Sequence, residues 1–446
     1  MTPQEAIALI DNLLQSVNKR HKLNDIQSLV FLETWEGDSY QEIADRHKYE
    51  HDYIKQVGSL LWRNLSQITG EKVSKHNLQA VLRRYQHRSA PNNCIQDWGE
   101  AIDVSYFYNR LQELETLETW ISSNSTRSIG IFGIGGIGKT SLSVKLAQQL
   151  QSQFEFVIWR SLQQAPTLDV ILSDILPILT GSSATTNHSI PALMEQLRQK
   201  RCLLILDNLE SILQAGNRSG QYQQGYEDYR QLFARIADES HQSCLILTGR
   251  EQPGGFAVRS GENSPVRSIK LFGVSPPVCQ QILADKGLKA TLLQCQVLVN
   301  HFGGNPLALK LAATTIQTLF GGDIHGFLVQ GNTVFSDLWD LLDRQFDRLS
   351  PLQQQIMYWI AINQEGATPA KLKAEILPKV SGRQLMEALE GLAERSLIED
   401  RRSLNESTFT NLMLQPAIGE YVRERFLQKD EQEIMTNQLN LFSTYA

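Results

Sequence analysis

The stretch that decides the fold runs Gly133-Ile134-Gly135-Gly136-Ile137-Gly138-Lys139-Thr140 and is followed by Ser141. It fits the pattern G-x-x-x-x-G-K-[ST], in which glycines let a loop turn its backbone N–H groups toward phosphate oxygens. Lys139 would reach the outer phosphates, the Thr140 hydroxyl would ligate Mg²⁺, and the following helix would add the positive end of its dipole. The predicted nucleotide contacts are Gly133, Gly135, Gly136, Ile137, Gly138, Lys139, Thr140 and Ser141.

The residues on either side of this loop distinguish a phosphate site from a glycine-rich turn that binds nothing. Residues 128–132 have the composition of a short buried strand. After the loop, apolar residues recur at helical spacing, at Leu142, Leu146, Ala147 and Leu150. Strand, loop and helix are the context that the motif requires, so the sequence favours the phosphate site.

Composition and charge narrow the class of protein. A chain of 446 residues is too long for one core, and about two to four domains are expected. The net charge of -6 argues against a protein that coats nucleic acid. The five cysteines have no C-x-x-C spacing, which is typical of core thiols in a reducing compartment. No signal peptide is recognisable, and no apolar run approaches the about 20 residues of a membrane span. We therefore expect a cytoplasmic protein with no membrane partner.

The distribution of apolar residues predicts several domains. Residues 1–88 should be helical, with a capping box at Ser39 and Glu42 that begins a short helix. A longer helix then carries Tyr53, Ile54, Val57, Leu60, Leu61, Leu65 and Ile68 on one side, as in a helix-turn-helix. The further boundaries that we predict are a linker at 89–105, a nucleotide-binding domain at 106–274, a helical domain at 275–338, a winged-helix domain at 339–428 and a tail at 429–446. Short strands at 396–398 and 408–410 behind helices suggest the winged helix.

Five apolar runs in the middle of the chain predict a parallel sheet. They lie at 129–132, 156–159, 202–206, 244–248 and 268–271, with helical patterns between them. Alternating strands and helices indicate helices on both faces of the sheet. The predicted fold class is therefore multidomain α/β plus α, built on a P-loop NTPase sheet.

Two charged residues follow predicted strands and are candidate catalytic groups. Asp207 ends the strand 202–206, where an acid beside Thr140 holds Mg²⁺, often through water. The alternative for Asp207 is a solvated helix cap. Arg250 follows the strand 244–248 and could approach a γ-phosphate, or it could be a surface salt-bridge partner.

Taken together, these motifs resemble the NB-ARC module of STAND-type signalling ATPases over about residues 98–425. Phe107-Tyr108-Asn109-Arg110 resembles the hhGR element that lies against adenine, with Asn109 in place of glycine. Gly304-Asn305-Pro306-Leu307 resembles the G-x-P-L motif, and the resemblance implies that Pro306 touches the base. Residues 346–360 and 385–398 resemble the winged-helix domain. The resemblance implies ATP/ADP and Mg²⁺ as cofactors, with Phe107, Tyr108, Arg110 and Pro306 at the base.

The sequence departs from this family at two positions. The family often has a second acid after the metal-binding one, but Asp207 is followed by Asn208, and an amide cannot take a proton. Glu210 is the nearest substitute for a general base. The family's M-H-D motif aligns with Leu414-Gln415-Pro416, in which Gln415 could still donate a hydrogen bond to the ADP β-phosphate.

The resemblance implies a molecular switch in signalling or defence. ADP would hold the domains closed, exchange for ATP would open them and allow homo-oligomerisation, and slow ATP hydrolysis would reset the state. An unidentified protein effector or sensor would be a partner. The amino-terminal domain also resembles the one that precedes NB-ARC in cyanobacterial proteins, whose C-terminal part is commonly a WD-repeat propeller. No such repeat precedes Ala446, so we expect a fragment or a member without this sensor.

Two other functions compete with the switch. The first is a transcription regulator whose helix-turn-helix binds DNA. Basic residues after the longer helix favour it, at Lys72, Lys75, Arg83, Arg84 and Arg88, whereas Glu50 and Asp52 near the start of that helix oppose it. DNA is therefore a less favoured partner. The second is a steady-state ATPase motor, which Asn208 and the switch-like motifs disfavour.

We predict that the site prefers adenine to guanine nucleotides. The resemblance places aromatic residues and Pro306 at the base, and the chain has no N-K-x-D guanine-reading motif after its later strands. GTP should therefore displace a fluorescent ATP analogue much less effectively than ATP does. Equal competition by the two nucleotides would contradict this expectation.

Overall fold

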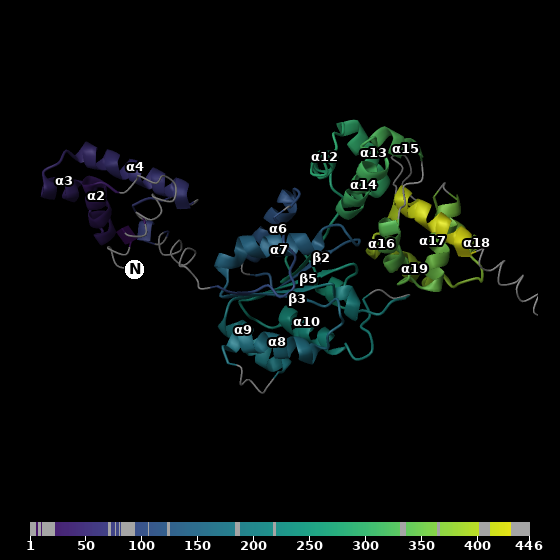
Figure 1. The fold of residues 1–446 in the computed structure, drawn as a ribbon. Coiled ribbons are helices and arrows are strands. Elements are labelled where there is room, and N and C mark those ends of the chain that lie inside the picture. The colour runs from purple at the N-terminus through teal and green to yellow at the C-terminus, as the bar shows by residue number, and fades with distance from the viewer. Residues whose placement is uncertain are drawn as a thin grey trace, which may run out of the picture. The chain divides into compact units, whose positions relative to one another are not determined.

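The protein was analysed as a computed structural model, in which the chain divides into two compact units, Met1–Cys94 and Ile95–Ala446 (Figure 1). The structure describes residues 6–7, 10, 23–69, 73–75, 77–79, 81, 94–105, 107–122, 125–182, 188–216, 220–330, 336–363, 366–400 and 411–429.

The first unit contains the helices α2 (Asp25–Glu36), α3 (Tyr40–His47) and α4 (His51–Thr69). The predicted capping box is confirmed, because the Ser39 N–H donates to the Glu42 carboxylate at 2.8 Å and the Glu42 N–H donates to the Ser39 hydroxyl at 3.4 Å. The buried aromatic and aliphatic residues that join these helices include Phe31, Trp35, Leu61 and Leu65. Tyr53 and Leu60, which we expected on the apolar side of α4, are exposed.

The second unit is built on a six-stranded sheet whose strand order is β1-β3-β4-β5-β2-β6. The strands are β1 (Ile95–Asp97), β2 (Ser128–Phe132), β3 (Phe156–Ser161), β4 (Cys202–Asp207), β5 (Cys244–Gly249) and β6 (Val266–Lys270). Every pairing between neighbours is parallel, as predicted. The strand β1 forms within the range predicted as a linker, and it has no apolar run that would reveal it, because it is defined by its pairing with β3.

Helices cover both faces of the sheet (Figure 1). On one face lie α6 (Leu111–Ser122) and α7 (Lys139–Leu150), and on the other lie α8 (Leu168–Thr180), α9 (Ile190–Gln199) and α10 (Asp228–Asp238). The strands β2, β4 and β5 are buried throughout, which explains their continuous apolar sequences. Their carboxyl ends meet at one edge of the sheet, where ligands of such folds bind.

Helices make up most of the chain after the sheet. A first group comprises α12 (Pro276–Ala284), α13 (Leu292–Phe302), α14 (Pro306–Leu319) and α15 (Ile324–Gln330). The group that follows, here called the C-terminal segment (residues 336–429), comprises α16 (Ser336–Phe346), α17 (Pro351–Asn363), α18 (Pro369–Glu375), α19 (Gly382–Glu394) and the antiparallel pair β7 (Glu399–Asp400) and β8 (Leu412–Met413). The strand expected at 396–398 begins only at Glu399, because Ser396 takes a left-handed turn conformation. The strand expected at 408–410 lies outside the described residues.

Candidate functional site

The loop between β2 and α7 has the backbone that its glycines permit. Gly136 and Gly138 have φ values of +79° and +101°, in the left-handed region that side chains rarely adopt. A Cβ on Gly136 would come within 2.8 Å of both Asn305 Oδ1 and Leu307 Cβ, whereas one on Gly138 would meet nothing within 4 Å. The loop is therefore packed on one side and open at the start of α7, where backbone N–H groups can receive an anion.

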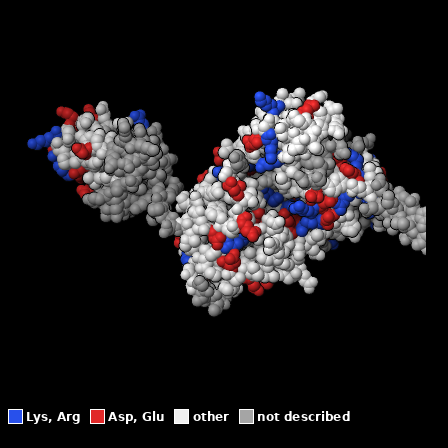
Figure 2. Space-filling view, in the orientation of Figure 1, with Lys and Arg blue, Asp and Glu red and all other residues white. Residues whose placement is uncertain are grey.

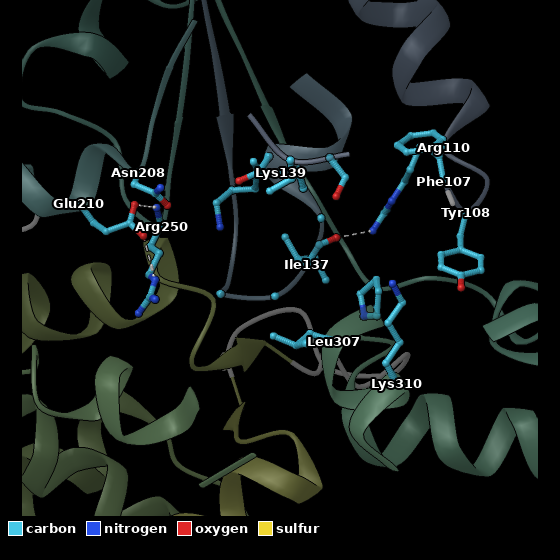
Figure 3. Close-up of a pocket in the computed structure, with 17 residues that line it drawn as sticks. Phe107, Tyr108, Arg110, Ile137, Lys139, Asn208, Glu210, Arg250, Leu307 and Lys310 are labelled. Carbon is cyan, nitrogen blue, oxygen red and sulfur yellow. Dashed lines mark hydrogen bonds and ion pairs between the residues drawn. The ribbon is translucent and has the colours of Figure 1, made fainter. Parts of the chain in front are cut away.

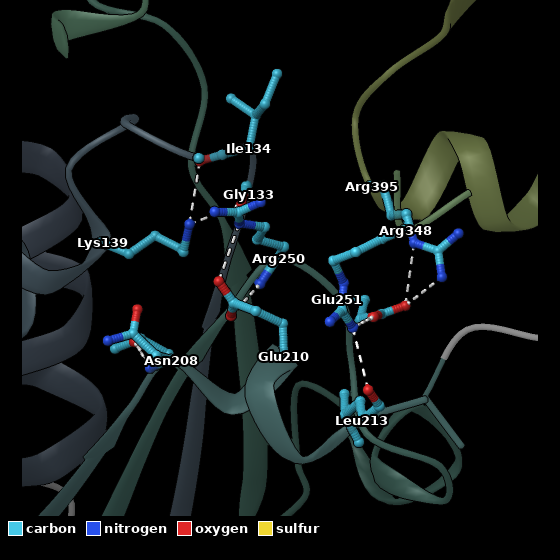
Figure 4. Close-up of polar contacts among 12 residues, drawn as sticks. Gly133, Ile134, Lys139, Asn208, Glu210, Leu213, Arg250, Glu251, Arg348 and Arg395 are labelled. Carbon is cyan, nitrogen blue, oxygen red and sulfur yellow. Dashed lines mark hydrogen bonds and ion pairs between the residues drawn. The ribbon is translucent and has the colours of Figure 1, made fainter. Parts of the chain in front are cut away.

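Lys139 lies at the centre of this site. Its ammonium donates to the backbone carbonyls of Gly133 at 2.8 Å and Ile134 at 3.0 Å, which folds the side chain back along the loop (Figure 4). Burial lowers the pKa of Lys139 to about 8, and the nearby Arg250 also lowers it, whereas the Glu210 and Asp207 carboxylates raise it. Phosphate oxygens in the loop would raise this pKa again, because they favour the charged ammonium.

Thr140 and Asp207, the predicted metal ligands, lie side by side. The Thr140 hydroxyl is 2.9 Å from each Asp207 carboxylate oxygen, and Asp207 also accepts a hydrogen bond from the Thr248 hydroxyl. Asp207 is only 2% exposed, and this burial raises its pKa, although the hydrogen bonds from Thr248 and Thr140 oppose the shift. One hydroxyl and one carboxylate suit Mg²⁺, which takes its remaining ligands from water and substrate phosphates.

Asn208 and Glu210 follow Asp207, and the first shapes the backbone whereas the second pairs with an arginine. Asn208 has φ +63°, a left-handed conformation that asparagine tolerates better than most residues, and it begins the short turn η2 (Leu209–Ile212). The Glu210 carboxylate accepts from Arg250, at 3.0 Å from its Nε and at 3.2 Å from its backbone N–H. Arg250 therefore lies at the cavity and forms its salt bridge with Glu210 there (Figure 3).

The opposite end of the cavity carries the predicted base-binding residues. Phe107 and Tyr108 line it, and the Arg110 guanidinium donates to the Ile137 carbonyl at 3.0 Å (Figure 3). Arg110 also pairs with Glu113 at 2.8 Å. Arg110 therefore supports the loop from the end of the cavity that Phe107 and Tyr108 line. The cavity has a volume of about 360 Å³, which is within the range of small-molecule sites.

The structure brings together most of the residues that the sequence predicted. The cavity is lined by Phe107, Tyr108, Arg110, Gly135, Gly136, Ile137, Gly138, Lys139, Thr140, Ser141, Glu210, Arg250 and Pro306. Gly133 and Asp207 lie just behind this wall, on Lys139 and Thr140.

Gln415 is the predicted contact that the structure does not place at the cavity. Its amide donates to the Glu399 carboxylate at 2.7 Å, and its side chain fills the space where a Cβ of Gly303 would lie. Glu399 lies in β7, which pairs with β8 just before Gln415, so the amide has its partner there and not at the phosphate end.

Sequence reasoning missed several residues of the wall: Ile102, Asn208, Leu307 and Lys310. It also missed Asn305, whose amide donates to the Gly135 carbonyl at 2.8 Å while its Oδ1 accepts from the N–H groups that begin α14. An asparagine before a proline is a helix-start signal, and Lys310 follows Pro306 at one helical turn, so both positions could have been found.

Comparison with known proteins agrees with this geometry. Residues 110–219 match the model of the NB-ARC domain, and residues 1–85 match that of the vWA-MoxR associated protein N-terminal HTH. The chain contains an NB-ARC domain. The matched range runs from Arg110 through the glycine-rich loop and Asp207, so it includes most of the residues predicted to contact the nucleotide. In the part of the chain that the structure describes, no helix is long and apolar enough to span a membrane.

A relative from Nostoc sp., described as an uncharacterized WD repeat-containing protein, is 42% identical over 391 residues. That match covers 84% of this chain but 30% of the relative, so the chain spans less than a third of its length. Similar solved structures include a Walker-type ATPase of Pyrococcus abyssi, at 14% identity and a TM-score of 0.48, covering 74% of this chain and 99% of that one. Another is a STAND protein with a tetratricopeptide repeat sensor from Pyrococcus horikoshii, at 20% identity and a TM-score of 0.36, covering 74% and 44%.

Lys139→Ala should weaken ATP binding roughly tenfold to more than a hundredfold, since a charge-assisted contact to phosphate is worth about 1.5 to 3 kcal/mol. The depressed pKa of about 8 adds a pH dependence. Above pH 8 the free protein loses the Lys139 proton that the complex needs, so affinity should fall by up to about tenfold per pH unit, with proton uptake on binding. Calorimetry from pH 7 to 9.5 measures both effects.

The Lys139→Ala variant serves as the control for the pH dependence, because its residual binding should not follow this slope. If Lys139→Ala binds ATP within threefold of the wild type, the assignment of the loop to phosphate is wrong.

Proposed function

We propose that this protein is an ATP- and ADP-binding switch of the STAND type, which couples nucleotide exchange and slow hydrolysis to separation of its domains. The observation that carries the proposal is Glu251, which directly follows Arg250. Its carboxylate accepts from Arg348 at 3.0 Å and from Arg395 at 2.8 Å (Figure 4). Both arginines belong to the C-terminal segment, so one buried acid ties that segment to the NB-ARC side of the cavity.

The contact between Glu251 and the two arginines is shielded from water. Glu251 is 1% exposed and Arg395 6% exposed, and Arg395 also donates to Gln353 at 2.9 Å. Breaking a buried pair of charges by removing one partner typically costs about 3 to 5 kcal/mol, because the other charge stays buried and unpaired. Figure 2 shows acidic and basic side chains gathered where the sheet region meets the C-terminal helices. The buried contact of Glu251 with Arg348 and Arg395 therefore stabilises the closed arrangement, and both ion pairs would break together if the C-terminal segment moved away.

The order of residues after β5 provides the link to the nucleotide. Arg250 points to Glu210 inside the cavity, and its neighbour Glu251 points to the C-terminal segment. An arginine that leaves Glu210 for a γ-phosphate would change the backbone beside Glu251. ADP would accordingly permit the closed arrangement, and exchange for ATP would release the C-terminal segment and expose surfaces for homo-oligomerisation.

Several features support slow hydrolysis of ATP to ADP and phosphate. Asn208 cannot accept a proton. Glu210 is paired with Arg250, so it can activate water only after Arg250 has left it for the γ-phosphate. Asp207 and Thr140 are positioned to hold Mg²⁺, which would neutralise charge on the phosphates. A slow reaction suits a switch whose lifetime is set by the bound nucleotide.

The first unit favours a protein effector or sensor over DNA. The start of α4 exposes Glu50, Asp52 and Tyr53, and acidic groups there would repel phosphates. Lys75 lies over the Tyr40 ring, 5.3 Å from its centroid, and the other basic residues that favoured DNA, Lys72, Arg83, Arg84 and Arg88, lie outside the described residues. The WD repeats of the Nostoc relative suggest that a repeat sensor completes such proteins, and we place this switch in cytoplasmic signalling or defence.

Glu210→Gln should bind ATP but turn it over about 10²-fold more slowly, because general-base catalysis is worth about 10² to 10⁴-fold. The trapped ATP state should appear as a larger species in size-exclusion chromatography with ATP. Phosphate release measures turnover, and Asn208→Asp is the comparison, since aspartate also tolerates the left-handed backbone at 208. Unchanged turnover in Glu210→Gln together with faster turnover in Asn208→Asp would assign the rate to the missing second acid.

Glu251→Gln should loosen the C-terminal segment, because it keeps the shape of the side chain and removes the charge between two arginines. We expect ADP release at least about tenfold faster, as a loss of about 1.4 kcal/mol implies, with earlier proteolytic cleavage in the C-terminal segment. Glu262→Gln, at an exposed site, is the control and should behave as the wild type. Wild-type ADP release from Glu251→Gln would remove the basis for the switch.

A further inference from the structure

Gln345, in the last turn of α16, carries a buried donor that the fold leaves unused. The residue is 5% exposed, and its amide nitrogen is buried without a hydrogen-bond partner among the described residues. Buried amides in native proteins nearly always have a partner, which can be an ordered water or a bound ligand. The mechanism derived above does not use this group.

The position of this amide points to the phosphate loop. A Cβ on Gly135 would lie 2.9 Å from Gln345 Nε2 and 3.5 Å from the guanidinium carbon of Arg250. The donor from the C-terminal segment, the Arg250 guanidinium and the third residue of the loop therefore converge at one point. A side chain at position 135 would occupy that point. Space for the Gln345 amide is therefore a second reason, besides the geometry of the loop, for a glycine at position 135.

Gly135 and Arg250 line the cavity at the end where Lys139 lies, whereas Gln345 lines a small adjoining pocket that it shares with Arg250, Glu251, Arg348, Arg395 and Leu397. Gly135 directly follows the two carbonyls that hold the Lys139 ammonium, and in this motif the lysine reaches the β- and γ-phosphates. The base-binding residues Phe107 and Tyr108 lie at the other end (Figure 3). A nucleotide laid along the cavity would thus bring its phosphates, and not its base, toward Gly135 and Arg250, the two residues that Gln345 adjoins.

We propose that Gln345 donates its amide N–H to an oxygen of the β- or γ-phosphate of the bound nucleotide. The inference rests on the proposed function, because it takes the ligand to be ATP or ADP. A neutral amide can approach a phosphate here without adding to the repulsion between Lys139 and Arg250, and a preoriented donor in a buried site binds a phosphate oxygen without reorganisation. The C-terminal segment then contacts the nucleotide directly, in addition to its contact through Glu251.

The decisive experiment is calorimetric titration of Gln345→Leu with ATP and with ADP in Mg²⁺. Leucine fills the space of the amide and removes the donor. Affinity should fall at least tenfold for ATP alone if the donor serves the γ-phosphate, or for both nucleotides if it serves the β-phosphate. Affinities within threefold of the wild type for both would overturn the proposal.

Two further variants separate a phosphate contact from simple packing. Gln345→Glu should bind more weakly than Gln345→Leu, because a carboxylate repels phosphate; equal affinities in the two variants would indicate packing and overturn the proposal. Gln355→Leu in α17 is the matched control, since its amide donates to the Leu377 carbonyl, and it should bind both nucleotides as the wild type does. If Gln345→Leu fails to fold, Gln345→Asn keeps the amide but withdraws it by one methylene, and the same losses are expected.

The outcomes also separate this inference from the proposed function. Wild-type binding that depends on Lys139 but is unaffected by Gln345→Leu leaves the switch in place and removes only the phosphate contact. Failure of the wild type to bind either nucleotide removes both.

Discussion

Parallel pairing of β2, β4 and β5 is the constraint on which the rest of the site depends. Strands that run in the same direction end at the same edge, so the phosphate loop after β2, Asp207 at the end of β4 and Arg250 after β5 meet there. The burial of these strands on both faces holds their ends in place. The polar groups of the cavity therefore need little local structure of their own to be positioned.

This edge of the sheet gathers charges that must satisfy one another. Asp207 is surrounded by hydroxyl donors, Glu210 is paired with Arg250, and Glu251 is enclosed by two arginines. Each carboxylate is tolerated away from water because donors surround it. A phosphate arriving beside Arg250 would compete with Glu210 for its guanidinium. In the proposed switch, this competition is the route from the nucleotide to Glu251, the next residue along the chain.

The helices after the sheet also contact the loop, at the start of α14. Asn305 donates to the Gly135 carbonyl, and the Leu307 N–H lies 3.3 Å from the Gly136 carbonyl. The loop is thus enclosed between α14 on one side and Gln345 of α16 on the other. Both contacts are made to backbone or glycine positions, so movement of either helical group would displace the loop that we predict to bind phosphates.

The sequence by itself determined the features that depend on residues close together in the chain. The G-x-x-x-x-G-K-[ST] spacing set the loop, five apolar runs set β2 to β6 within two residues, and Ser39 with Glu42 set the start of α3, because each depends on neighbours a few positions away. Only the tertiary structure decided that β1 pairs in the expected linker, that Glu399 takes Gln415 from the cavity and that Asn208 turns left-handed. It alone brought Glu251 to Arg395 and Gln345 to Gly135. Glu251 and Arg395 are 144 positions apart in the chain. Contacts of this kind depend on how whole helices pack against the sheet, which no local pattern encodes.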